Sequence, residues 1–197
     1  MTASIQVLHV DDEPGFAELA ADFLRRADDR FEVVTETSAE AGMEVLNRHD
    51  IDCIVSDHDM PGMNGIEFLE AIREEYPDLP FILFTGKGSE AVASKAVSAG
   101  VTDYLQKETG TDHYTLLANR IENAVERYRT HQTLERERER YQTFLEQSTD
   151  LIATVDGHGR FEYVSQAWQR IIGYDPDDLV GENAFEFMHE EDRNDVW

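Results

Sequence analysis

Five short apolar runs alternate with amphipathic segments in the N-terminal part of the chain, and this alternation limits the fold more than any other feature. The intervening segments carry apolar residues at three- and four-residue steps, the period of a helix packed on one face. Such alternation predicts βαβ units with helices on both faces of a parallel sheet, and right-handed crossovers favour a doubly wound α/β sheet of order 2-1-3-4-5. The predicted strands are Ile5–Val10, Phe31–Thr35, Ile51–Ser56, Phe81–Thr85 and Asp103–Leu105, and the predicted helices are Pro14–Ala27, Ser38–Arg48, Gly65–Tyr76 and Ser89–Ala99.

Reactive side chains stand at the ends of four of these runs. Asp11 and Asp12 follow the first run, Asp57 follows the third, Thr85 ends the fourth and Lys107 comes just after the fifth. Because the carboxyl ends of these parallel strands meet at one crevice, we expect the five side chains to lie together. Three close carboxylates repel one another unless a cation lies among them, and Mg²⁺ is the expected ion. A carboxylate there can act as a nucleophile on a phosphoryl group, whose oxygens a hydroxyl and an ammonium group would bind.

Residues 3–128 resemble the receiver domain of two-component response regulators, which has a flavodoxin-like fold. The resemblance implies that Asp57 is the phosphoacceptor and that a partner histidine kinase supplies the phosphoryl group. It also implies that the domain promotes its own phosphorylation and dephosphorylation, and no kinase core is recognised in the sequence. The matching segments are Val10-Asp11-Asp12-Glu13, Ser56-Asp57-His58-Asp59-Met60-Pro61-Gly62-Met63-Asn64-Gly65, Phe84-Thr85-Gly86 and Tyr104-Leu105-Gln106-Lys107.

The resemblance assigns a metal site to four aspartates. It implies that Asp11, Asp12 and Asp57 hold Mg²⁺ through their carboxylates and that Asp59 contributes its main-chain carbonyl. Asp59 also stands two residues beyond the phosphoacceptor, as Lys87 stands two residues beyond Thr85. These two opposite charges are expected to flank the entry of water, where they could pair.

The remaining roles implied by the resemblance belong to the last two strands. Thr85 would bind the phosphoryl group and move with it, Tyr104 would be the aromatic part of the switch, and Lys107 would bind the phosphate. The family usually has proline after this lysine, whereas Glu108 stands here. We therefore expect a looser loop around Lys107.

A phosphatase of the haloacid dehalogenase type is the rival interpretation. Asp57-His58-Asp59 is an Asp-x-Asp motif whose first acid could be a nucleophile. That fold places its nucleophile on the first strand and its metal-binding acidic pair late in the chain. Here the acidic pair comes first, which favours the receiver.

A continuous helical pattern runs from about Asp112 to about Gln147. Its first part has an apolar stripe that includes Leu117, Ile121 and Val125, whereas in its middle Glu and Arg alternate around Leu134. We expect a receiver domain over residues 1–128 and a helical connector over 129–146, continuous with the last receiver helix. The connector is expected to be solvated and could pair with its own copy in a homodimer, although three apolar heptads are lacking.

Residues 147–197 resemble the first half of a PAS sensory domain, a partial α+β module. The sequence predicts a hairpin from Leu151–Val155 and Arg160–Val164, followed by a helix at Gln166–Ile172. The resemblance extends through Phe187-Met188-His189-Glu190-Glu191-Asp192-Arg193. It identifies no PAS ligand. The parent protein is expected to be a hybrid histidine kinase or a regulator with another output, and a stand-alone adaptor is an equal alternative. In each case the phosphorylation state of the receiver is expected to reach the PAS module.

The charge of the chain limits its partners and its setting. With 42 acidic and 17 basic residues, a formal charge of −25 argues against binding to nucleic acid or to an anionic membrane. Only three basic residues are lysines, and this composition is typical of a salt-loving organism. The single Cys53 allows no internal disulfide, and no apolar run is long enough for a membrane span. A cytoplasmic location is expected.

The same charge predicts a salt-dependent stability. Repulsion between exposed acidic side chains is unscreened at low ionic strength and destabilises the folded state. We expect the melting temperature, followed by circular dichroism, to rise when KCl is raised from about 0.1 M to about 2 M, where the Debye length falls below about 3 Å. A melting temperature that stays flat over this range would contradict the halophile interpretation.

Overall fold

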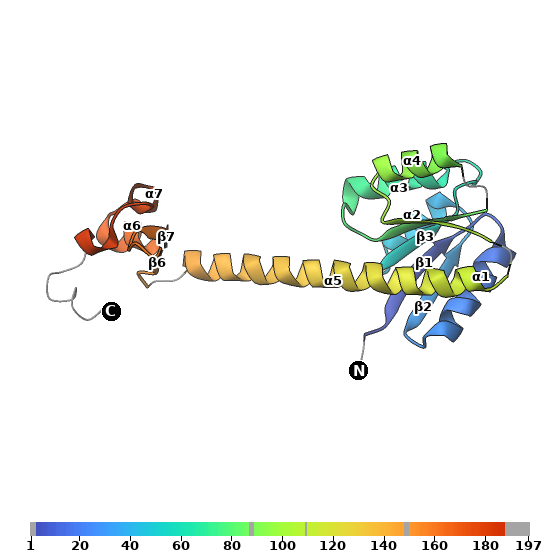
Figure 1. Ribbon diagram of the computed structural model, residues 1–197, viewed down its shortest axis with the longest axis horizontal. Coiled ribbons are helices and arrows are strands. Elements are labelled where there is room, and N and C mark those ends of the chain that lie inside the picture. The colour runs from blue at the N-terminus through green and yellow to red at the C-terminus, as the bar shows by residue number, and fades with distance from the viewer. Residues whose placement is uncertain (1–2, 87–88, 109, 148–149, 188–197) are drawn as a thin grey trace. The chain divides into compact units, whose positions relative to one another are not determined.

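The computed structural model describes residues 3–86, 89–108, 110–147 and 150–187 (Figure 1). It forms two compact units, residues 1–131 and 132–197. The predicted pair of Asp59 with Lys87 and the last part of the PAS resemblance, 188–193, involve residues outside those described.

The first unit contains the predicted parallel sheet. Five strands pair in parallel in the order β2-β1-β3-β4-β5, which confirms the prediction. The strands are β1 (Ile5–Val10), β2 (Phe31–Glu36), β3 (Cys53–Ser56), β4 (Phe81–Thr85) and β5 (Asp103–Gln106). The helices between them are α1 (Pro14–Ala27), α2 (Ala39–Leu46), α3 (Gly65–Glu75) and α4 (Glu90–Ser98), and α5 (Asp112–Gln147) follows β5.

Helices cover both faces of this sheet (Figure 1). On one face, α1 and α5 pack against Ile5 and Val7 of β1. On the other, α2, α3 and α4 pack against Leu8 and Val10 of the same strand. Both faces are therefore buried, which explains why the central strands are continuous apolar runs rather than alternating ones.

Strand β3 begins later than the sequence predicts, at Cys53 rather than Ile51. The reason is Asp52, whose carboxylate accepts the backbone N–H of Gln6 at 2.9 Å and forms two hydrogen bonds with Arg129 of α5, at 2.7 and 3.0 Å. This clamp, formed by Asp52 and Arg129, joins the start of β3 to α5 at the end of the sheet opposite the carboxyl ends of the strands. Arg129 is far from Asp52 in the sequence, so the local apolar pattern could not predict this pairing.

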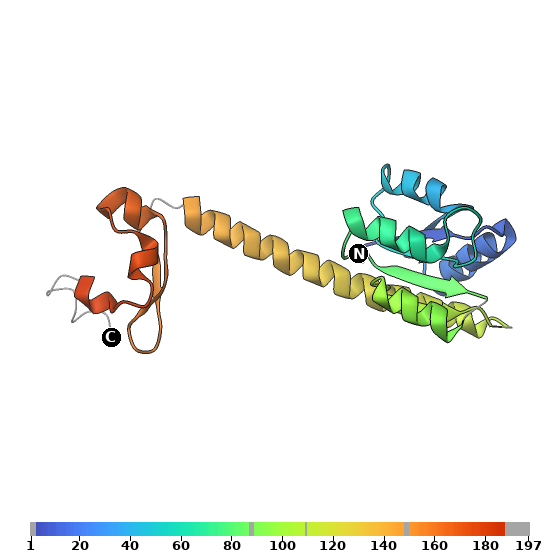
Figure 2. The same cartoon turned by 90° about the horizontal axis from the view of Figure 1, so that it is seen from above.

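Helix α5 belongs to both units, because the division falls after His131. Its first part buries Leu117, Ile121 and Val125 in the core, as predicted. From Thr130 to Phe144 nearly all its side chains are exposed, including Leu134, and the helix continues without a break (Figure 2).

After the end of α5, the second unit contains the predicted hairpin, whose first strand begins at Ala153 rather than Leu151. Strands β6 (Ala153–Val155) and β7 (Phe161–Val164) are antiparallel, and Asp156 closes the turn between them by accepting the backbone N–H groups of His158 and Arg160. Three short helices follow and pack on Phe161 and Val164, which confirms a small α+β unit. They are α6 (Ala167–Ile172), α7 (Pro176–Leu179) and the 3₁₀ helix η1 (Ala184–Phe187).

Candidate functional site

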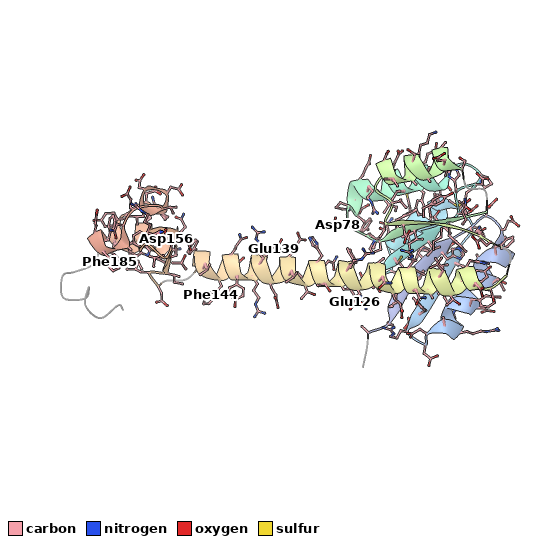
Figure 3. All side chains as sticks on the ribbon, in the orientation of Figure 1. Asp78, Glu126, Glu139, Phe144, Asp156 and Phe185 are labelled. Atoms are coloured by element: carbon pink, nitrogen blue, oxygen red, sulfur yellow. The ribbon has the colours of Figure 1, made fainter. Side chains whose placement is uncertain are left out.

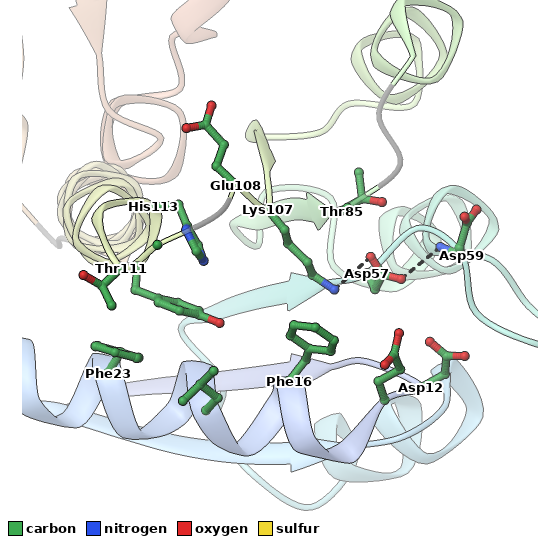
Figure 4. Close-up of a pocket in the computed structure, with 15 residues that line it drawn as sticks. Asp12, Phe16, Phe23, Asp57, Asp59, Thr85, Lys107, Glu108, Thr111 and His113 are labelled. Atoms are coloured by element: carbon green, nitrogen blue, oxygen red, sulfur yellow. Dashed lines mark hydrogen bonds and ion pairs between the residues drawn. The ribbon is translucent and has the colours of Figure 1, made fainter.

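Three carboxylates meet at the carboxyl ends of β1 and β3, where the sequence predicts them. One oxygen atom from each of Asp11, Asp12 and Asp57 lies within 4.8 Å of the others. Asp11 is 1% exposed and Asp57 is 6% exposed, whereas Asp12 is half-buried. Figure 4 shows Asp12 and Asp57 extending into the same space. Such a set of oxygen atoms suits a hard divalent cation.

Lys107 reaches this cluster from the end of β5. Its ammonium group donates to Oδ2 of Asp11 at 2.6 Å and to Oδ1 of Asp57 at 3.2 Å. Burial alone would lower the pKa of Lys107, but its hydrogen bond with Asp11 and the negative charges of Asp11 and Asp57 outweigh burial and raise the pKa. The lysine is therefore charged at neutral pH, and its side chain is held even though Glu108, not proline, follows it.

The charges of the cluster do not balance. Three carboxylates and one ammonium group leave an excess of two negative charges. His9, buried on β1 two residues before Asp11, does not compensate this excess, because burial lowers the pKa of His9 to about 4 and keeps its ring neutral at pH 7. The excess equals the charge of one divalent cation.

The backbone around Asp57 is fixed on several sides. The Asp57 N–H donates to the carbonyl of Val10 at 2.8 Å, and the Ser56 hydroxyl donates to the carbonyl of Asp57 at 2.8 Å. The backbone N–H of Asp59 donates to Oδ2 of Asp57 at 3.2 Å, so the loop that follows also orients the carboxylate. The first residue of α3, Gly65, packs so closely that a Cβ atom there would lie 2.1 Å from the Asp57 carbonyl oxygen.

The two predicted switch residues occupy different places. Thr85 is buried at the end of β4, lines the same pocket as Asp57, and accepts the backbone N–H of Lys107 at 2.9 Å through its carbonyl. Tyr104 lies on β5, pairs in register with Leu83, and packs against the core that α2, α3 and α4 cover. Within the part of the chain that the structure describes, the buried Tyr104 hydroxyl has no hydrogen-bond partner.

The cluster opens into a pocket of about 600 Å³. Beyond the carboxylates, this pocket is lined by aromatic side chains from α1 and α5 (Figure 4). Phe23 stacks face to face on Tyr114, with 4.6 Å between ring centroids, and Tyr114 in turn contacts His113. Phe16 is closer to the carboxylates, and its ring centroid lies 5.5 Å from Nζ of Lys107.

These aromatic residues were not predicted as part of the site. The sequence did carry one signal, since Phe16 and Phe23 stand two helical turns apart on α1, outside the stripe formed by Ala17, Ala20, Ala21 and Leu24 that the core buries. On a helix whose first apolar stripe is already buried in the core, a second apolar stripe indicates that its side chains line another surface, which here is the wall of the pocket.

A protein-family comparison agrees with this geometry. The model of the response regulator receiver domain matches residues 7–119, more than half of the chain. This chain belongs to the response regulator receiver family. A model of the PAS fold matches residues 139–196, so a receiver domain of two-component signalling is followed here by a PAS fold. Because Asp57 follows the third strand and not the first, the receiver interpretation is retained over the phosphatase.

Similar proteins match the receiver domain, and some of them extend over most of the chain. The bacterioopsin transcriptional activator of Halobacterium salinarum is 29% identical over 91% of this chain and 28% of its own length. A receiver domain protein from Clostridium thermocellum has 26% identity and a TM-score of 0.58, covering 64% of this chain and 98% of its own. The beryllofluoride-activated NtrC4 receiver domain dimer has 28% identity and a TM-score of 0.56, over 62% and 98%.

This chain spans about a quarter of the length of several curated relatives, among them the bacterioopsin transcriptional activator. Among the described residues, no helix combines the length and the apolar character that a membrane span requires.

Proposed function

We propose that this receiver domain accepts a phosphoryl group on Asp57, in a Mg²⁺-dependent transfer from the phosphohistidine of a partner histidine kinase. The observation that supports this most is the cluster of three carboxylates around Lys107, with its excess of two negative charges. A divalent cation would neutralise that excess, and an incoming phosphoryl group would find a fixed ammonium group beside the acceptor oxygen.

The proposed metal ligands are the carboxylates of Asp11, Asp12 and Asp57 and the main-chain carbonyl of Asp59. All are oxygen atoms, the ligand type that Mg²⁺ prefers, and the half-buried Asp12 leaves the cluster open to water on one side. Bound there, Mg²⁺ would supply positive charge for the oxygens of the phosphoryl group.

The chemistry proposed for Asp57 is a nucleophilic displacement at phosphorus. A carboxylate oxygen of Asp57 forms the new O–P bond, while the P–N bond of the phosphohistidine breaks and the imidazole leaves with the electron pair. Lys107 neutralises charge on the transferred oxygens, and the Thr85 hydroxyl donates a hydrogen bond to them. Hydrolysis of the acyl phosphate by water returns the free carboxylate.

Beryllofluoride, which mimics a phosphoryl group on aspartate, tests this proposal in the full chain. By calorimetry with Mg²⁺ present, we expect one equivalent to bind the wild-type protein and none to bind Asp57→Asn. Asp29→Asn, an exposed aspartate that follows α1, is the matched control and should bind as the wild type does. Binding that Asp57→Asn retains would refute the assignment.

We also propose how the parts divide the work: a receiver over residues 1–128, a connector over 129–146 and a partial PAS domain over 147–197. The PAS model reaches back to residue 139, inside α5, which supports a helix shared between the two functions. Inward movement of Thr85 towards a phosphoryl group would leave space for Tyr104, whose hydroxyl forms no hydrogen bond with the described residues that would hold it back.

The connector is the proposed route to the PAS domain, through pairing with a second copy. Leu134 and Tyr141 are exposed and stand one heptad apart in a segment that is otherwise rich in Glu and Arg. Phe144, labelled in Figure 3, adds a further exposed ring. Apolar side chains at heptad spacing are the contacts of a two-stranded coiled coil. The clamp between Arg129 and Asp52 would hold the point at which this helix leaves the receiver.

A distance measurement between copies tests the connector. With a spin label on Arg136→Cys, an exposed position of α5 away from the Leu134 and Tyr141 stripe, in a Cys53→Ala background, we expect a dimer whose label-to-label distance changes when beryllofluoride and Mg²⁺ are added. The same variant carrying Asp57→Asn is the control and should show no change. A monomer at every concentration, or a distance that stays constant, would mean that the connector is a passive tether.

A further inference from the structure

The ammonium group of Lys107 lies close to two aromatic rings. Its nitrogen is 5.5 Å from the ring centroid of Phe16 on α1 and 5.7 Å from that of Phe84 on β4. Both distances fall within the range of about 6 Å over which a cation is attracted to the face of a ring. Figure 4 shows the Phe16 ring extending from α1 towards the end of the lysine side chain.

The two rings differ in their burial and in their other contacts. Phe84 is buried in the core and also contacts His113 and Tyr114, so its position is set by the fold. Phe16 is 44% exposed, so burial in the core does not account for the position of its ring.

The carboxylate partners of Lys107 do not remain its own through the proposed reaction. Asp11 and Asp57 accept its hydrogen bonds here, yet both are proposed metal ligands, and an oxygen of Asp57 forms the new O–P bond. Once a metal ion and a phosphoryl group engage these oxygens, the lysine must exchange carboxylate acceptors for phosphoryl oxygens. The Phe16 ring is a ligand of neither the metal ion nor the phosphoryl group, so its attraction for the ammonium group persists through this exchange.

We propose that Phe16 is a positioning residue for Lys107, whose ring keeps the ammonium group beside Asp57 when the carboxylates are occupied. This inference rests on the proposed function and adds to it one residue of α1. The ring attracts the charge without neutralising it, so the full positive charge stays available to the phosphoryl oxygens. A long lysine side chain otherwise has many rotamers, and ordering it would reduce the affinity for the phosphoryl group.

Three variants separate this role from simple packing. Phe16→Leu keeps apolar bulk and removes the ring, whereas Phe16→Tyr keeps a ring and is the conservative rescue. Leu19→Ala is the matched control, because Leu19 lies on the same helix, is 45% exposed, and makes no ring contact with the lysine. Calorimetry of the full chain with beryllofluoride at saturating Mg²⁺ gives the affinity, and it involves no kinase whose docking the variants could disturb.

We expect Phe16→Leu to bind beryllofluoride about three- to tenfold more weakly than the wild type, the range that a partly desolvated cation–ring contact gives. Phe16→Tyr and Leu19→Ala should bind within about twofold of the wild type, and Mg²⁺ affinity measured alone should change little in all three. Equal affinity in Phe16→Leu, or the same loss in Leu19→Ala or in Phe16→Tyr, would overturn the inference.

Lysine resonances give a second readout, which reports whether the ammonium group stays beside the ring when the site is occupied. The chain has only three lysines, Lys87, Lys95 and Lys107, so a ¹³C-lysine spectrum can be assigned by substitution. The difference between the wild type and Phe16→Leu identifies the upfield shift of the Lys107 Hε protons that the Phe16 ring causes, and this shift should persist when Mg²⁺ and beryllofluoride are bound. Absence of the shift, or its loss on binding, would overturn the inference. If the wild type itself binds no beryllofluoride, the proposed function fails instead.

Discussion

Replacing Asp12 by alanine is expected to weaken Mg²⁺ binding by more than about a hundredfold, because loss of even an outer-shell partner of a metal costs roughly 10- to 100-fold. The expected effect on folding is small. Asp12 is half-buried, and within the described ranges no hydrogen bond or ion pair of its side chain is found. Asp11 is less suitable for this test, since its removal would take away the shorter of the two contacts of Lys107. The measurement is a calorimetric Mg²⁺ titration at constant ionic strength.

The control for this prediction removes an equal charge elsewhere. Asp22→Ala deletes an exposed carboxylate of α1 that is paired with Arg25 at the surface. The net charge of the two variants is identical, so a general electrostatic effect would weaken Mg²⁺ binding equally in both. Equal affinities in Asp12→Ala and the wild type would mean that the carboxylate cluster is not the metal site.

A methyl group at position 65 is expected to cost about 3 kcal/mol of unfolding free energy, at the upper end of overpacking effects. The added Cβ atom of Gly65→Ala would lie 2.1 Å from the carbonyl oxygen of Asp57 and 2.8 Å from Cδ1 of Leu83. The nearest atom belongs to the backbone, so it cannot rotate away, and the loop that carries Asp57 must shift. Urea denaturation measures the cost, and beryllofluoride affinity should fall together with stability.

Gly15→Ala provides the contrast. Gly15 lies in the first turn of α1, and a Cβ atom there would meet nothing within 4 Å. Alanine is the better helix former, so this variant should be neutral or more stable by about 0.5–1 kcal/mol. If the two alanine variants have the same stability, the close approach of α3 to the phosphoacceptor loop does not constrain that loop.

Periodicity predicted the sheet of this chain because both faces of its central strands are buried. Continuous apolar runs such as Phe81–Thr85 separated by helical patterns leave few topologies, and the strand order places Asp11, Asp57, Thr85 and Lys107 at one edge. The convergence of the site thus follows from the fold alone. Assigning roles to these residues required the family resemblance.

Such patterns do not predict contacts between segments that are distant in the sequence. The start of β3 depends on the pairing of Asp52 with Arg129, and the environment of Lys107 depends on Phe16 of α1. Neither contact has a local signature, since each joins side chains that only the finished sheet brings together. Glu108 after the lysine still predicts a loose loop, yet the lysine side chain itself has two carboxylate partners.

Chemical localisation of the transferred phosphoryl group identifies the phosphoacceptor residue. The full chain would be incubated with acetyl phosphate and Mg²⁺, reduced with borohydride to convert an aspartyl phosphate into homoserine, and digested for tandem mass spectrometry. We expect homoserine at position 57 alone, and none in Asp57→Asn or when a chelator replaces Mg²⁺. Homoserine at another aspartate, or undiminished phosphorylation of Asp57→Asn, would contradict the assignment of Asp57 as the phosphoacceptor.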